Sequence, residues 1–172
     1  MRRPHPLSRV GLAGLIIFPV ALAACSGGSA PTSSAEAELQ QKADLYDIDQ
    51  IEVKWHQAAS THNVDLMMSL WADDATFTLG GMTYTGKDQI RTLFATKAAP
   101  FLPINHWESD TPAYKIKITV NGDTGTLYFE CHYVDPATKK VMVVAGANQD
   151  VKRINGTWLI VNSIGTSPAL GS

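Results

Sequence analysis

The sequence YKIKITVNGDTGTLYFECHYV, residues 114–134, gives the clearest indication of the fold. Apolar and polar side chains alternate over residues 114–120, which is the pattern of a strand with one buried and one solvated face. Asn121-Gly122-Asp123 is a strong signal for a tight hairpin turn. Residues 126–134 then return as a second strand. We therefore expect an antiparallel β-hairpin in this part of the chain.

The hairpin pattern continues toward the C-terminus. Residues 140–154 read as a long strand, Asn155-Gly156 as another hairpin turn, and residues 158–164 as a last strand. The sequence therefore predicts a four-stranded antiparallel meander, followed by a loose tail over residues 167–172.

Helical patterns precede this meander. Apolar residues recur at helical spacing over residues 45–58, and Asp44 is the expected N-cap of this first helix. Asn63 is expected to cap a short second helix, which Asp73-Asp74 would end. A third helix is expected after a capping box formed by Thr85 and Asp88.

Short strands are also expected on either side of Gly80-Gly81, over residues 75–79 and 82–84. Helices first and strands later indicate an α+β fold. We predict a cone-shaped α+β barrel in which three N-terminal helices pack on a strongly curved, mostly antiparallel sheet. The open mouth of such a cone is a natural site for a small ligand.

The N-terminus carries an export signal. Arg2, Arg3 and Arg9 form a basic region, and residues 10–24 contain no charged side chain. The ending Leu22-Ala23-Ala24-Cys25 resembles the lipobox of bacterial lipoproteins, which implies cleavage before Cys25 and lipidation of its thiol. A plain secretory signal with a chance cysteine is the alternative. A membrane-spanning helix would need a longer apolar run.

These features predict four parts of the chain and a location. Residues 1–24 are the signal peptide, 25–43 the lipidated cysteine with a flexible tether, 44–166 one folded domain, and 167–172 the tail. Lipidation of Cys25 implies a protein of the cell envelope, anchored to a membrane and facing outside the cytoplasm. The formal net charge is −2, and no basic run appears in the mature chain, so nucleic acid is not an expected partner.

Several phrases of the predicted domain are similar to one known family. They are LWADDATF (70–77), GKDQIRTLF (86–94) and VVAGANQDVKRINGTWLIVNSIG (143–165). Together with the hairpin 121–134 they resemble the SnoaL-like branch of the nuclear transport factor 2-like superfamily, relatives of scytalone dehydratase and ketosteroid isomerase. One fold of this kind supports many activities, so the resemblance alone does not fix the function.

The resemblance implies a set of pocket residues. The scytalone dehydratase group carries two pocket histidines at a spacing close to that of His106 and His132, which are therefore the candidate catalytic residues. Neutral imidazole is well suited to proton transfer near pH 7. The same group places a tyrosine and an asparagine near the substrate, at positions that match Tyr84 and Asn148. Each of these residues could instead have a purely structural role.

The sequence departs from that pattern at one functional position. Ser60 stands where related domains usually carry an aspartate at the end of the first helix. Glu130 could replace this acid, because Glu130 and His132 share one face of a strand. The alternative is that both face outward and that Leu127, Phe129, Cys131 and Tyr133 form the inward set.

Two functions remain open from the sequence. The first is cofactor-free acid–base chemistry, as in a lyase or isomerase, on a small and mostly apolar molecule. The second is a non-catalytic ligand-binding or accessory lipoprotein. A metal site is not expected, because no third ligand accompanies the two histidines, and no phosphate or dinucleotide motif appears. Strands with apolar residues on both faces also predict a homodimer that covers the outer face of the sheet.

Overall fold

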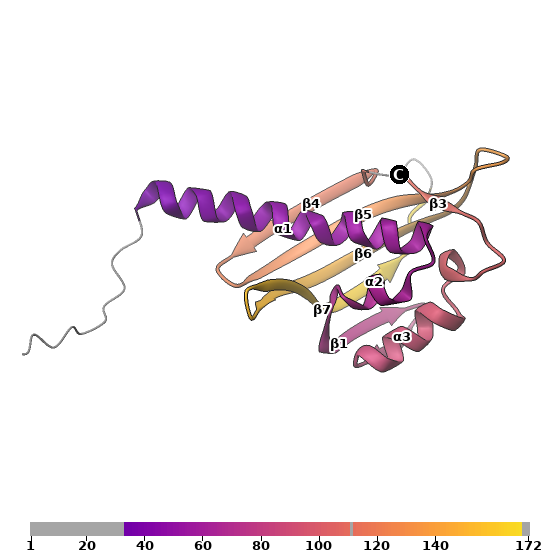
Figure 1. Cartoon of the computed structure of the whole chain (residues 1–172), viewed down its shortest axis with the longest axis horizontal. Coiled ribbons are helices and arrows are strands. Elements are labelled where there is room, and N and C mark those ends of the chain that lie inside the picture. Colours follow the sequence, from indigo (N-terminus) through magenta and orange to yellow (C-terminus); the bar gives the residue numbers. More distant parts are fainter. Residues whose placement is uncertain (1–32, 111, 170–172) are drawn as a thin grey trace, which may run out of the picture. The chain divides into compact units, whose positions relative to one another are not determined.

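A computed structural model describes residues 33–110 and 112–169 (Figure 1). The predicted signal peptide, the predicted lipidation site Cys25 and the first part of the predicted tether lie outside the described residues.

The first helix begins earlier than the sequence pattern predicts. Helix α1 spans Ser34–Ser60, and Ser33 caps it in a capping box with Glu36. The Ser33 hydroxyl accepts from the Glu36 amide at 3.3 Å, and the Glu36 carboxylate accepts from the Ser33 amide at 2.8 Å. The prediction that Asp44 caps the helix is therefore wrong, and residues 34–43 are helical rather than a flexible tether. The sequence contains the signal for this start, because Ser-x-x-Glu followed by good helix formers is typical of a helix N-terminus.

The connection from α1 to the sheet is a short helix followed directly by a strand. Helix α2 spans Val64–Met68, and the Asn63 side chain accepts from the Leu66 amide at 2.9 Å, so the predicted cap is confirmed. Strand β1 spans Trp71–Leu79. Asp73 and Asp74 therefore lie within a strand instead of ending a helix. They lie in an irregular stretch of β1, between Trp71 and Thr76, which both pair with β7.

The third helix uses a different start from the one predicted. Strand β2 spans Met82–Thr85 and helix α3 spans Lys87–Thr96, with Gly86 at the N-cap and no side-chain cap. Gly86 has φ = +80°, a conformation that favours glycine. The predicted capping box of Thr85 and Asp88 is wrong, and the Gln89 side chain accepts from the Thr85 amide instead. A 3₁₀ turn, η1, follows at Ala99–Phe101.

The predicted four-stranded meander is confirmed and forms most of one sheet. Its strands are β4 (Lys115–Asn121), β5 (Thr124–Asp135), β6 (Lys140–Ile154) and β7 (Thr157–Thr166). The short strand β3 (Glu108–Ser109) also pairs with β5. The order is β2-β1-β7-β6-β5-β3, and β4 pairs with β5 off this path.

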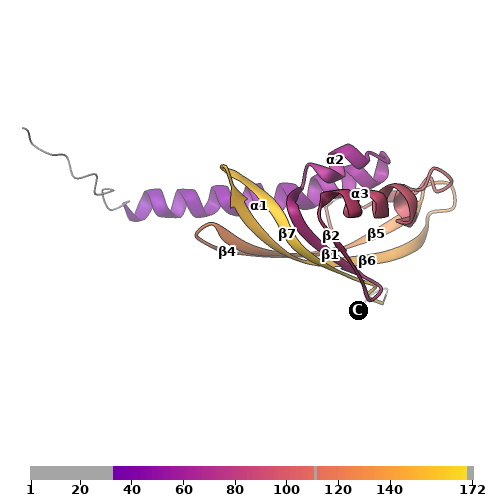
Figure 2. The same ribbon diagram turned by 90° about the horizontal axis from the view of Figure 1, so that it is seen from below.

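All neighbouring strands are antiparallel except β1 and β7, which are parallel. Figure 2 shows the three helices on one side of a curved sheet. The predicted α+β class and the curved, mostly antiparallel sheet are therefore confirmed, although the sheet does not close into a complete barrel.

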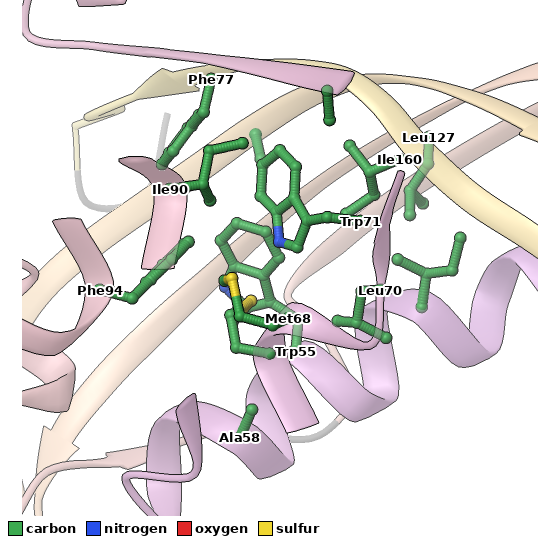
Figure 3. Close-up of a cluster of buried hydrophobic side chains, with 14 of the residues drawn as sticks. Trp55, Ala58, Met68, Leu70, Trp71, Phe77, Ile90, Phe94, Leu127 and Ile160 are labelled. Atoms are coloured by element: carbon green, nitrogen blue, oxygen red, sulfur yellow. The ribbon is translucent and has the colours of Figure 1, made fainter. Parts of the chain in front are cut away.

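The core lies between the helices and the concave face of the sheet. Trp55 of α1 packs against Trp71 and Phe77 of β1 and against Phe94 of α3, with ring centroids 5.5–6.3 Å apart (Figure 3). Aromatic pairs at such separations contribute beyond the area that they bury. These rings fix the position of α1 and α3 over the sheet, and Trp55, Phe77 and Phe94 also line a pocket.

Candidate functional site

An apolar pocket opens on the concave face of the sheet. It has a volume of about 220 Å³ and lies between η1, the end of α3, and strands β5, β6 and β7. Its aromatic lining comes from six residues, Trp55, Phe77, Phe94, Phe101, Phe129 and Tyr133. Aliphatic and small side chains complete the wall, chiefly Leu79, Pro100, Val143, Ala145, Ala147 and Gly165.

Few polar groups line this pocket. Among the described lining residues, those with a polar side-chain group are Lys97, Thr166, Ser167, Tyr133 and Trp55. Lys97 is exposed, and its ammonium lies 6.0 Å from the centre of the Tyr84 ring. Tyr133 is only 3% exposed. Burial, followed by the neighbouring Cys131, raises the pKa of Tyr133 well above its ordinary value.

The pocket is therefore suited to holding an apolar body rather than to moving a proton. A group that transfers protons near pH 7 needs a pKa in that range, and Tyr133 does not have one. Burial also raises the pKa of Cys131 to about 12, so its thiol stays protonated and unreactive.

The structure does not bring the two predicted catalytic histidines together in this pocket. His106 is exposed and lies in the loop before β3. His132 lies on β5, on the face of the sheet that points away from the helices. Its Nδ1 is 3.1 Å from Oδ2 of Asp110, and its ring lies 4.8 Å from that of Tyr114. Asp110 also accepts from the backbone amide of His132 at 2.6 Å.

Strand parity explains the placement of His132 and Glu130. Leu127, Phe129, Cys131 and Tyr133 are the inward set and are buried in the core, so the outward alternative weighed from the sequence is the one observed. Glu130 is only 5% exposed. It accepts a hydrogen bond from the Tyr128 hydroxyl and lies 3.5 Å from Nζ of Lys115. The carboxylate beside His132 is thus Asp110, from the segment before β4.

The two predicted substrate-binding residues also lie outside the pocket lining. Asn148 is exposed on the outer face of β6, beside Tyr128 of β5 and Ile164 of β7. Tyr84 of β2 is partly buried and packs at the edge of the core. Ser60, at the position of the missing acid, accepts from the Ser109 amide at 2.9 Å. Its role is to hold β3 against the end of α1.

Sequence reasoning missed a buried polar pair on α1. Glu52 and His56 are 1% and 0% exposed, and Glu52 Oε1 lies 2.7 Å from His56 Nδ1. This is a close contact rather than an aligned hydrogen bond, because Nδ1 has no satisfactory partner geometry. Glu52 also accepts from the Ala113 amide at 2.9 Å and so holds the segment before β4. The spacing of four residues was visible in the sequence as a shared helix face.

Other missed residues are the aromatic side chains that line the pocket. Trp55 and Phe129 could be identified as apolar and inward-facing, but their contribution to a cavity depends on how α1, η1 and the sheet pack together. Within residues 33–110 and 112–169, no group of three His, Cys, Asp or Glu side chains is placed to hold a metal ion. In the same part of the chain, no helix is both long and apolar enough to span a membrane.

The SnoaL-like domain family matches residues 40–163. This covers most of the chain, and the chain belongs to that family. No curated protein matches the sequence significantly.

Similar solved structures have the same fold at low sequence identity. An NTF2-like protein with a cystatin-like fold from Novosphingobium aromaticivorans has a TM-score of 0.65 at 18% identity, covering 84% of this chain and 94% of its own. A hexachlorocyclohexane dehydrochlorinase, LinA type 2, has a TM-score of 0.61 at 18% identity, covering 77% and 90%. An NTF2-like superfamily protein from Salmonella enterica has a TM-score of 0.61 at 17% identity, covering 76% of this chain and 95% of its own. At this identity the likeness shows the fold alone.

Proposed function

We propose that this protein is a non-catalytic binding protein for a small, mostly apolar molecule, held in the concave pocket. The observation that carries the proposal is the chemistry of the pocket lining. Aromatic and aliphatic side chains dominate it, and the two candidate histidines lie elsewhere. This is the arrangement expected of a ligand-binding cone without an acid–base centre.

The pocket volume limits the size of the ligand. An engineered cavity of ~150 Å³ lined by apolar side chains binds benzene, and this pocket has about 220 Å³. A ligand of one or two rings, or a short branched chain, therefore fits without rearrangement of the wall. Each buried CH₂ contributes ~0.8 kcal/mol to binding, so affinity should follow the apolar size of the ligand up to that limit.

The test is identification of the ligand that copurifies with the protein, by solvent extraction and mass spectrometry. Ala145→Phe places a phenyl ring inside the pocket and should remove the ligand. Val144→Phe is the matched control, because residue 144 directly precedes Ala145 in β6 and points to the opposite face. Retention of the ligand by Val144→Phe and its loss from Ala145→Phe are expected. Equal amounts in both variants, or no ligand in the wild type, would contradict the proposal.

The acid–base function predicted from the sequence is the alternative. The fold is shared with a dehydrochlorinase, so this fold is compatible with an enzyme active site. Proton transfer by His106 or His132 would require the ligand to reach the outer face or the exposed loop. If the protein converts its ligand to a product and His132→Gln abolishes this conversion, the result would favour the alternative.

We also propose that the domain is attached to a membrane of the cell envelope through a lipid on Cys25. The Leu-Ala-Ala-Cys ending of the apolar N-terminal stretch supports it. Cys25→Ala should move the protein from the membrane fraction to the soluble fraction without loss of folding. A wild-type protein that is already soluble, with an unmodified residue at its N-terminus, would contradict this.

The homodimer stays a prediction. Sedimentation of the purified protein at micromolar concentration should give about twice the monomer mass. A single species at the monomer mass would contradict it.

A further inference from the structure

The concave face carries a second row of side chains, next to those that line the pocket. Ala147 of β6 and Gly165 of β7 are paired neighbours in the pocket wall. Two residues along each strand, Gln149 of β6 pairs with Ser163 of β7 and projects from the same face. The partners of this row on either side are Leu127 of β5 and Phe77 of β1.

Both polar side chains of this row are buried without a hydrogen-bond partner. Gln149 is 2% exposed and Ser163 is fully buried. Among the described residues, neither the oxygen nor the nitrogen of the Gln149 amide has a partner, and nor does the Ser163 hydroxyl. Most buried polar groups in folded proteins are hydrogen-bonded, so an adjacent pair that is not bonded calls for a specific cause.

An apolar residue at either position would cost the fold less. Leaving a buried donor or acceptor unpaired is destabilising, whereas an apolar group of the same shape is nearly neutral. Two such groups lie one row beyond Ala147 and Gly165 of the pocket wall, and neither is itself a lining residue. Their position points to a bound molecule that reaches past the wall and supplies the missing partners.

The chemistry of the row also defines the kind of group that it accepts. An amide and a hydroxyl can each donate and accept, but neither carries charge. The paired neighbours of the row on the concave face are apolar. An ionised group would be buried there without a counter-charge, which is strongly unfavourable.

Resting on the proposed binding function, we propose that the ligand is a neutral amphiphile, whose hydroxyl or carbonyl oxygen reaches Gln149 and Ser163 while its apolar body fills the pocket. Trp55 lines the pocket and packs against Phe77 and Phe129, which flank the two rows. The polar end of the ligand therefore passes beside Trp55.

Toluene and p-cresol test this directly, because they differ in one hydroxyl group. In a purely apolar pocket the hydroxyl would be buried unpaired, and p-cresol would bind roughly ten- to a hundredfold more weakly than toluene. With the polar row as its partner, p-cresol should bind the wild-type protein at least as tightly as toluene. Isothermal titration calorimetry of both compounds measures this ratio.

Gln149→Met removes the amide and keeps the length of the side chain. It should weaken p-cresol binding by about tenfold and leave toluene binding unchanged. Without ligand, this variant should also melt about 3 °C higher, because an unpaired amide has been removed from the core. Lys152→Met is the matched control, since it makes the same substitution at an exposed position of the same strand.

The possible results separate this inference from the proposed function. A p-cresol preference lost only in Gln149→Met supports both. If the wild-type protein binds toluene but binds p-cresol much more weakly, the proposed role of Gln149 and Ser163 is wrong, whereas the proposed apolar binding pocket is supported. Binding of neither compound overturns the polar row and counts against the binding function itself, which the copurification experiment then decides independently.

Discussion

Replacing Asp44 by Asn should destabilise the fold strongly, because it removes one charge of an ion pair between α1 and the sheet. Asp44 lies within α1 and is 3% exposed. Its Oδ2 is 2.6 Å from Nη2 of Arg153 on β6, and its Oδ1 accepts from Gln40 at 2.9 Å and from the Trp158 indole at 3.4 Å. The bonds to Arg153 and Trp158 connect the first half of α1 to strands β6 and β7, next to the hairpin turn between them.

The magnitude follows from what the substitution leaves behind. Breaking a buried ion pair by removing one partner costs ~3–5 kcal/mol when the remaining charge is fully buried. Arg153 keeps 22% of its side chain exposed, still bonds Asp123 at 3.0 Å, and lies 4.8 Å from the Trp158 ring. We therefore expect a loss of about 2–3 kcal/mol in the free energy of unfolding. In urea this lowers the midpoint by about 1–2 M at a typical m-value.

The effect has a defined pH dependence. Burial acts to raise the pKa of Asp44, but hydrogen bonds from Arg153, Gln40 and Trp158 outweigh it and hold the pKa below its usual 3.8. A carboxyl whose pKa is lower in the folded state stabilises the fold above its unfolded pKa, and this contribution disappears as the pH falls through the folded value. The difference between wild type and Asp44→Asn should be complete at pH 7 and shrink below about pH 4.

The assay is urea unfolding followed by circular dichroism at several pH values. Asp123→Asn is the matched control, because Asp123 bonds the same guanidinium but is 73% exposed at its side chain, and its loss should cost less than ~1 kcal/mol. Equal effects of the two substitutions would refute the reasoning, and so would an Asp44→Asn penalty that is the same at pH 7 and pH 3.

Three further outcomes are expected. Gly125→Ala should lower the free energy of unfolding by at least about 2 kcal/mol in the same urea assay, because its Cβ would lie 2.5 Å from the backbone oxygen of Thr119; a stability equal to the wild type would contradict the close approach. Cys131 should react with iodoacetamide at pH 8 only after unfolding, since its thiol is buried with a pKa of about 12. Rapid labelling of Cys131 in the native protein, detected by peptide mass spectrometry, would contradict this prediction. Asn148→Leu should leave toluene binding unchanged within twofold, because Asn148 is exposed on the outer face, and a clear loss would favour the substrate-binding role predicted from the sequence.

The sheet was predictable because its signals are local. Alternation over residues 114–120 and the turns at Asn121-Gly122 and Asn155-Gly156 specify strands and connections without reference to the rest of the chain. The start of β1 was not predictable in this way. Trp71 enters a strand because it pairs in parallel with Ile160 of β7, whose amide donates to the Leu70 oxygen at 2.8 Å. A contact between segments so distant in sequence leaves no local pattern.

The candidate site was less predictable for a different physical reason. A one-residue shift along a strand moves a side chain to the opposite face of the sheet. Asn148, singled out by resemblance, is exposed on the outer face, while its neighbour Gln149 is buried on the concave face without a partner. In the same way His132 points outward, and Cys131 and Tyr133 point inward.

Parity along β5 could have been decided from the sequence, because the more apolar set of an alternating strand faces the core. On β6 the same reasoning places Gln149 inward, because Ala147 and Val151 share its parity, whereas Asp150 and Lys152 share that of Asn148. The pairing of Gln149 with Leu127 and Ser163 agrees with this placement. Polar residues on the buried face of a strand are costly to the fold, so a position of this kind is where a ligand-binding role is most worth testing, ahead of residues selected by their resemblance to an enzyme.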